Sequence, residues 1–190
     1  MPSSSASAVT TAAAFGEKDA EHSSELFRQS LDTFSKAATE YPENAHVRGM
    51  WAGAAHNFGL HLTNGRHFEE AIPMFRQAED LNRGLVEKFP ALPARRHALG
   101  MNLQARGETL IVAGRASDGK QPLEEALTLF RTLSTDYPVI GEYSRLTASC
   151  LDQLCRYKPA ENDWEGIRSN YAEAVGRMRQ ALSHDPGNDT

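Results

Sequence analysis

The chain has 190 residues, enough for one domain or two at most, and its 20 Lys and Arg against 25 Asp and Glu give a net charge of −5. Ala (26) and Leu (18) far outnumber Val (6) and Ile (4), which favours helices and argues against a β-sandwich, a barrel or a parallel sheet. No apolar run is long enough to span a membrane, and a surface of negative charge offers no general attraction to nucleic acid or anionic lipid.

The N-terminal segment, residues 1–16, is rich in Ser, Ala and Thr and lacks the basic and apolar regions of a secretory signal. It is predicted to be a disordered tail. The first helix is predicted over residues 18–40, where Phe27, Leu31 and Phe34 fall on a single stripe at helical spacing. The last residues, 185–190, are predicted to form a short tail.

Between these tails, proline recurs at a constant interval of 48. The four dipeptides are Tyr41-Pro42, Phe89-Pro90, Tyr137-Pro138 and Asp185-Pro186. Each follows a segment with helical spacing of apolar residues, and proline cannot continue a helix interior. A second helical segment follows each of the first three prolines. Seven helices are therefore predicted, over residues 18–40, 44–64, 67–88, 92–113, 121–136, 140–157 and 163–183. Pro122 is expected in the first turn of the fifth. Since each pair buries only one side by itself, successive pairs are expected to stack.

The stretch 50–90 carries a recognisable pattern of large and small residues: Ala55, Phe58, Gly59, Leu62, Gly65, Phe68, Ala71, Phe75 and Ala78. This pattern resembles the tetratricopeptide repeat (TPR), a helix-turn-helix unit whose usual length is about 34 residues. The interval of 48 is similar to the long-helix variety of kinesin-light-chain-type and bacterial kinase-associated arrays. In that resemblance Gly59 and Ala71 are places of close helix approach, and Phe75 fills the space between repeats. Arg106 departs from the pattern, because a large apolar residue belongs there.

The resemblance implies an all-α, right-handed α-solenoid of seven antiparallel helices. A lone helix (18–40) would precede three repeats, over about 43–90, 91–138 and 139–186, within a helical domain spanning 17–184. In such arrays the first helix of each pair lines the concave groove, so the candidate partner-binding residues are His56, Asn57, Leu60, Gln104, Glu108, Asp152 and Arg156. Their polar groups suit hydrogen bonding to a peptide backbone. The function predicted is a non-catalytic protein–protein interaction module that binds a peptide or protein segment. The alternative is a regulatory or sensor array of a larger bacterial signalling protein, such as a serine/threonine kinase, with a small molecule held beside Trp51 and Met101.

The sequence contains no motif that predicts catalysis. Residues 114–121 nearly spell a phosphate-binding loop, but a helix precedes them and Gln121 replaces the Ser or Thr that would hold Mg²⁺. His56 and His61 are five apart on one helix and diverge too far to share a metal. We therefore predict no enzyme, no metal and no cofactor.

Two cysteines, Cys150 and Cys155, stand five apart in a helical segment, where they diverge too far for an easy disulfide. This favours a reducing, cytoplasmic compartment. Neither nucleic acid nor membrane is expected as a partner. Apolar stripes at the ends of a solenoid would predict self-association, unless the chain is a piece of a longer array.

Overall fold

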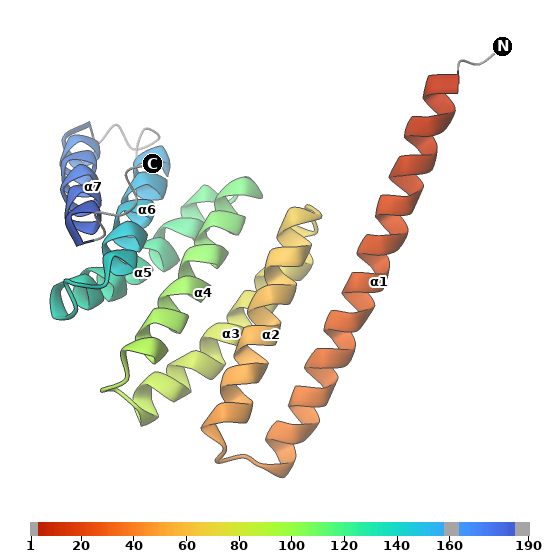
Figure 1. The fold of residues 1–190 in the computed structure, drawn as a ribbon, viewed down its shortest axis with the longest axis horizontal. Coiled ribbons are helices and arrows are strands. Elements are labelled where there is room, and N and C mark those ends of the chain that lie inside the picture. The colour runs from red at the N-terminus through yellow and green to blue at the C-terminus, as the bar shows by residue number, and fades with distance from the viewer. Residues whose placement is uncertain (1–3, 158–163, 185–190) are drawn as a thin grey trace.

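The computed structural model describes residues 4–157 and 164–184, and within these ranges it contains seven helices and no strands (Figure 1). The all-α fold predicted from composition and periodicity is confirmed. The helices are α1 Ser4–Glu40, α2 Ala45–Asn64, α3 Phe68–Lys88, α4 Pro93–Val112, α5 Ala116–Asp136, α6 Gly141–Tyr157 and α7 Trp164–His184. The predicted tail 185–190 lies outside the described residues.

The interval of 48 seen in the prolines is also the interval between helix starts. The first helices α2, α4 and α6 begin at Ala45, Pro93 and Gly141, which are equally spaced at that interval. The second helices α3, α5 and α7 begin at Phe68, Ala116 and Trp164, again at the same interval. Residues separated by 48 therefore occupy equivalent positions on equivalent helices.

Helix α1 begins at Ser4, so the predictions of disorder over residues 1–16 and of a helix from residue 18 are wrong at this end. The reason lies in the composition of the segment. Five of its residues are alanine, the strongest helix former, and no proline interrupts the chain between Pro2 and Pro42. Among the described helices, α1 included, none combines the length and apolar character needed to cross a membrane.

Helix α5 begins at Ala116, five residues before the predicted start, so Pro122 lies inside the helix and not in its first turn. The early start follows from the turn before it. Gly114 adopts a left-handed conformation, with φ of 80°, that glycine accepts readily, and α5 starts two residues later. Pro122 deprives one carbonyl of its helical hydrogen bond, but its ring is fully buried and its packing offsets part of that loss.

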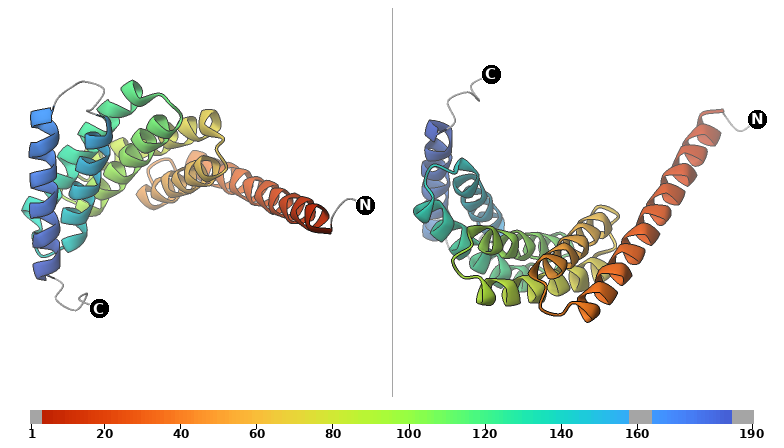
Figure 2. Two further views of the ribbon diagram at one scale, coloured as in Figure 1. Left: turned by 90° about the horizontal axis from the view of Figure 1, so that it is seen from above. Right: turned by 60° about the horizontal axis from the view of Figure 1, so that its bottom comes forward.

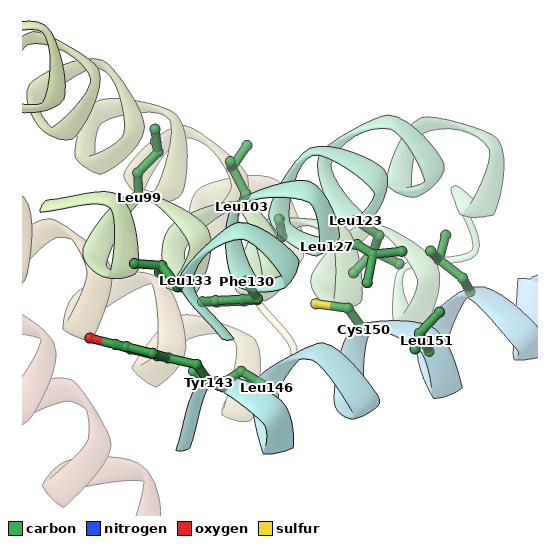
Figure 3. Close-up of a cluster of buried hydrophobic side chains, with 12 residues drawn as sticks. Leu99, Leu103, Leu123, Leu127, Phe130, Leu133, Tyr143, Leu146, Cys150 and Leu151 are labelled. Carbon is green, nitrogen blue, oxygen red and sulfur yellow. The ribbon is translucent and has the colours of Figure 1, made fainter. Parts of the chain in front are cut away.

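The helices pack in chain order. Among the described residues, each helix contacts the next, α2 also contacts α4, α4 also contacts α6, and helices further apart do not meet. The larger core cluster joins α4, α5 and α6, where Phe130 lies close to Tyr143, Leu146 and Cys150 (Figure 3). A smaller cluster joins α2 and α3 around Phe58, Leu62, Ala71 and Phe75, against which Phe27 and Leu31 of α1 pack. The core is thus distributed along the row of helices.

Gly59 lies at a close contact between α2 and α3. A Cβ atom built on it would lie 2.7 Å from the ring of Phe75, a separation that real side chains do not tolerate. Ala71 and Phe75 are both completely buried in the same contact. The small–large pairing that the sequence pattern predicted at this site is therefore present.

The row of helices is bent (Figure 2). First helices approach one another, α2 to α4 and α4 to α6, to within 8 Å between Cα atoms. No such approach occurs between α3 and α5, or between α5 and α7, in the described part of the chain. Because the first helices are the closer set, they lie on the inner side of the bend.

Candidate functional site

The exposed side of α2, α4 and α6, which we call the inner face, is tied together by side chains. Three hydrogen bonds join successive first helices: Thr63 Oγ1 to Thr109 Oγ1 at 3.0 Å, Gln104 Nε2 to Ser149 Oγ at 2.9 Å, and Gln153 Nε2 to Glu108 Oε2 at 3.3 Å. Each bond joins residues almost one full repeat apart in the chain. They fix the spacing of the three helices, so the face between them is preformed.

Five of the seven candidate residues reach solvent on this face, of which Asp152 is half-buried, with 41% of its side chain exposed. Asn57 and Leu60 of α2, Glu108 of α4 and Arg156 of α6 all have solvent-accessible side chains. Leu60 keeps 39% of its surface in contact with solvent. Val112 on α4, outside the candidate set, is exposed to 53%. The inner face thus presents aliphatic side chains beside an amide, a carboxylate and a guanidinium.

The structure places His56 and Gln104 between helices instead. The His56 ring meets the Phe75 ring edge-on, with 5.8 Å between centroids. Burial lowers the pKa of His56, which keeps the imidazole neutral near pH 7. Gln104 is 8% exposed and its amide donates to Ser149. These two residues connect helices, and in this arrangement they offer little surface to a ligand.

Asp152, the remaining candidate, is paired along its own helix. Arg156 Nη2 lies 2.8 Å from Asp152 Oδ2, and Arg156 Nε donates to the same oxygen at 3.0 Å. The arginine side chain is 73% exposed, so the pair contributes little to stability. Asp152 and Arg156 still place one negative and one positive charge on the inner face, at its α6 end.

Two cavities flank α1. One, of about 650 Å³, lies among α1, α2 and α3 and is lined by Trp51, Arg48, Arg76 and Asp80 with neighbouring residues. The other, of about 540 Å³, lies between α1 and the turn that joins α2 to α3. Met101 lines neither cavity, so the structure does not place it beside Trp51 as the small-molecule alternative expected.

A buried ion pair explains the departure at Arg106. Its Nε lies 2.5 Å from Glu79 Oε1 on α3, and its Nη2 lies 3.0 Å from Glu79 Oε2. Burial raises the pKa of the Glu79 carboxyl, and the hydrogen bonds from Arg106 oppose this only in part. At the equivalent positions one repeat on, Leu127 and Leu154 are both buried. The Glu79–Arg106 ion pair therefore takes the place of the contact between Leu127 and Leu154 in the next repeat. The signal in the sequence was an acidic and a basic residue at two positions that both hold leucine one repeat later.

A repeated outer ion pair was also missed. Arg83 on α3 pairs with Glu125 on α5, and Arg131 on α5 pairs with Glu173 on α7. Both partners of the second pair lie one repeat after those of the first. Each pair bridges second helices whose backbones stay apart. A search for opposite charges that recur together at the repeat interval would have found it.

Groups suited to chemistry are few in the described part of the chain. No cluster of three or more His, Cys, Asp or Glu residues there could hold a metal ion. Cys150 is completely buried, and burial raises the pKa of its thiol to about 12. A thiol with that pKa carries almost no thiolate at neutral pH and is a poor nucleophile.

No model of a known protein family matches the chain, and no curated protein matches it either. The resemblance to the tetratricopeptide repeat therefore remains a prediction from the residue pattern. The packing order, the bend and the chemistry of the inner face carry the functional argument.

Proposed function

We propose that the chain forms a right-handed α-solenoid of the tetratricopeptide kind, with antiparallel helices and three long repeats after a leading helix. We further propose that it is a non-catalytic interaction module whose inner face binds a peptide or protein segment. Two features support this: helix starts that recur at a constant interval, and helices that pack only with near neighbours in the chain. The unlinked, buried cysteines fit a reducing, cytoplasmic setting.

The observation that carries the proposal is the mixed chemistry of the inner face. A bound segment needs apolar contact for its side chains and hydrogen-bonding partners for its backbone. Leu60 and Val112 supply the first, and Asn57, Glu108 and Arg156 supply the second. The bonds between first helices hold these groups in place before binding, which lowers the entropic cost of association.

Site-specific photocross-linking tests the location of binding. A benzophenone amino acid at position 60 or 112 should capture a defined segment, which mass spectrometry identifies. The matched control places the same group at Glu124 or Thr128 on α5, away from the inner face. Equal capture at inner and outer positions would contradict the proposal.

Affinity for the captured segment, made as a synthetic peptide, tests the residues. Asn57→Ala and Glu108→Ala should each weaken binding by about three- to tenfold, since each removes one hydrogen-bonding group. Glu124→Ala should leave the dissociation constant unchanged. Fluorescence anisotropy with a labelled peptide measures all three.

One observation favours the sensor alternative. The Nε1 atom of Trp51 is buried without a hydrogen-bond partner among the described residues, and Trp51 lines the cavity of about 650 Å³. A small molecule with an acceptor could satisfy that donor. A metabolite panel screened by thermal shift tests this reading, with Trp51→Phe as the matched variant. If a metabolite stabilises the native chain but not Trp51→Phe, the cavity beside Trp51 is the functional site.

A further inference from the structure

Helix α7 carries an apolar stripe that the described structure leaves uncovered. Its members are Trp164 (62% exposed), Tyr171 (46%), Val175 (49%), Met178 (40%) and Leu182 (49%). Spacings of seven, four, three and four put them on one face of the helix. A contiguous stripe of five large apolar side chains marks an interaction surface.

The repeat shows what kind of surface this is. On α5 the positions equivalent to Tyr171, Val175 and Met178 are filled by residues that are at most 5% exposed: Leu123, Leu127 and Phe130. These residues belong to the core cluster with α6 (Figure 3). On α5 this row of residues lies between two helices: Phe130 and Leu123 pack against Gly100 and Gly107 of α4, and the other side of the row packs against α6. On α7 the side toward α6 has its partner, and the side that a following helix would cover is open.

A hollow beside the stripe has the matching shape. A cavity of about 370 Å³ lies between α6 and α7, lined by Ala148 and Ser149 on one side and by Tyr171, Val175 and Met178 on the other. One repeat earlier, α6 follows α5, and its Tyr143, Leu146 and Cys150 share one core cluster with Leu123, Leu127 and Phe130. The stripe and the hollow beside it together have the apolar character and the shape to pack against a helix.

We propose that this helix is α7 of a second copy of the chain, which packs antiparallel to the first about a two-fold axis near Glu173. The stripe, extended by Arg168, follows a heptad seam at 164, 168, 171, 175, 178 and 182. The seam is symmetric about residue 173. In the antiparallel pair Trp164 therefore faces Leu182 of the second copy, and Tyr171 faces Val175.

Charge selects the antiparallel direction. A parallel pair would bring Arg168 of both copies together in the seam, whereas the antiparallel pair sets Arg168 against Met178. Glu165 and Arg179 flank the seam on the same side, two heptads apart, and both are exposed. Antiparallel packing puts Glu165 of each copy beside Arg179 of the other, which gives two ion pairs between the copies.

Sedimentation velocity of the full chain tests the association, from about 1 μM to about 200 μM. The 20.9 kDa chain should shift to twice its mass with rising concentration. Val175→Glu should raise the dissociation constant at least tenfold, and the control Glu124→Arg on α5 should leave it unchanged. A chain that stays monomeric throughout would overturn the proposal and would leave the stripe to a helix of another protein.

Charge exchange tests the direction. Glu165→Arg and Arg179→Glu should each weaken association, and the double variant should restore it. Failure of the double variant to recover would exclude the antiparallel arrangement. Ala172→Cys, near the two-fold axis, should cross-link with a short bis-maleimide, whereas Glu124→Cys should not; the native Cys150 and Cys155 are buried. The hollow beside the stripe is also lined by Ser149 and Asp152 of the inner face. The test variants are therefore all on α7, so that association can be lost while Asn57 and Glu108 remain unchanged.

Discussion

Helices α5 and α7 occupy equivalent places in the repeat, yet within residues 4–157 and 164–184 a following helix covers α5 and none covers α7. Phe130 is completely buried, and Met178, its equivalent, is 40% exposed. The N-terminal end of the row of helices differs from both. There α1 covers α2, with Phe27 stacked on Phe58 at 5.4 Å between ring centroids. The comparison shows that the repeat fixes which face of a helix is apolar, whereas the neighbour decides whether that face is core or surface.

The largest expected difference in stability is between two residues at equivalent positions of the repeat, Phe75 in the core and Tyr171 at the surface. Phe75→Ala should cost about 3–5 kcal/mol, because it opens a cavity in a fully buried contact. Tyr171→Ala, at the equivalent position on α7, should cost the monomer less than about 1 kcal/mol, because Tyr171 is 46% exposed. Urea denaturation at low protein concentration measures both. Equal losses would mean that α7 is as well packed as α3.

The buried ion pair offers a second contrast between repeats. Arg106→Leu should cost about 3–5 kcal/mol, because it leaves the Glu79 carboxylate buried without its partner. Glu79→Leu combined with Arg106→Leu should recover most of that loss, because the equivalent residues one repeat on are Leu127 and Leu154. Denaturation of both variants decides. A double variant no better than the single one would contradict the equivalence of the two contacts.

The pH dependence of the single variant follows from the raised pKa of Glu79. A carboxyl whose pKa is higher in the folded state holds its proton there after the unfolded chain has lost it. Stability therefore falls as pH rises from the ordinary carboxyl pKa through the raised one. Without Arg106 the pKa rises further, so Arg106→Leu should lose more stability relative to the native chain at pH 8 than at pH 5.

Much of this architecture was predictable from the sequence. The proline interval predicted the starts of α2, α4 and α6 within one residue, and the loop residues before α3 and α7 predicted those two starts equally well. Proline, loop residues and apolar spacing act locally, so these boundaries could be predicted. The start of α5 was not predictable in the same way. Pro122 reads as a helix start in isolation, and only its burial in the α4–α5 contact shows why a helix passes through it.

The candidate site was predictable in part. Helical spacing identified Asn57, Leu60 and Glu108 as facing away from the core, and the structure agrees. The same spacing could not show that Gln104 meets Ser149, because that contact depends on how closely α4 and α6 approach. The Arg106 pairing was hidden for the same reason. Its partner Glu79 lies on a different helix.

A smaller effect distinguishes glycines in the packed region from those on α7. Gly59→Ala should cost about 1–3 kcal/mol, because its Cβ would overlap the Phe75 ring. Gly176→Ala should instead stabilise the chain by about 0.5–1 kcal/mol, since nothing lies within 4 Å of the new atom and alanine is the better helix former. Thermal denaturation gives the sign of each change directly. The same sign for both would contradict the close α2–α3 contact.

The smallest expected effect concerns the two outer ion pairs, Arg83 with Glu125 and Arg131 with Glu173. They occupy equivalent positions in successive repeats, so their contributions to stability can be compared. Arg83→Gln and Arg131→Gln should each cost less than about 1 kcal/mol, because both arginines are substantially exposed. The loss should be smaller for Arg131→Gln, since Arg177 also lies 3.6 Å from Glu173 and keeps part of the attraction.

Acid titration of stability isolates the Glu173 pair. The hydrogen bond from Arg131 lowers the pKa of Glu173, so the pair stabilises the folded chain above the ordinary carboxyl pKa. That contribution disappears as pH falls through the lowered value. The native chain and Arg131→Gln should therefore differ most near neutral pH and converge in acid. A difference that persists after acid has protonated the Glu173 carboxyl would mean that Arg131 stabilises α7 by packing its aliphatic stem, and not by charge.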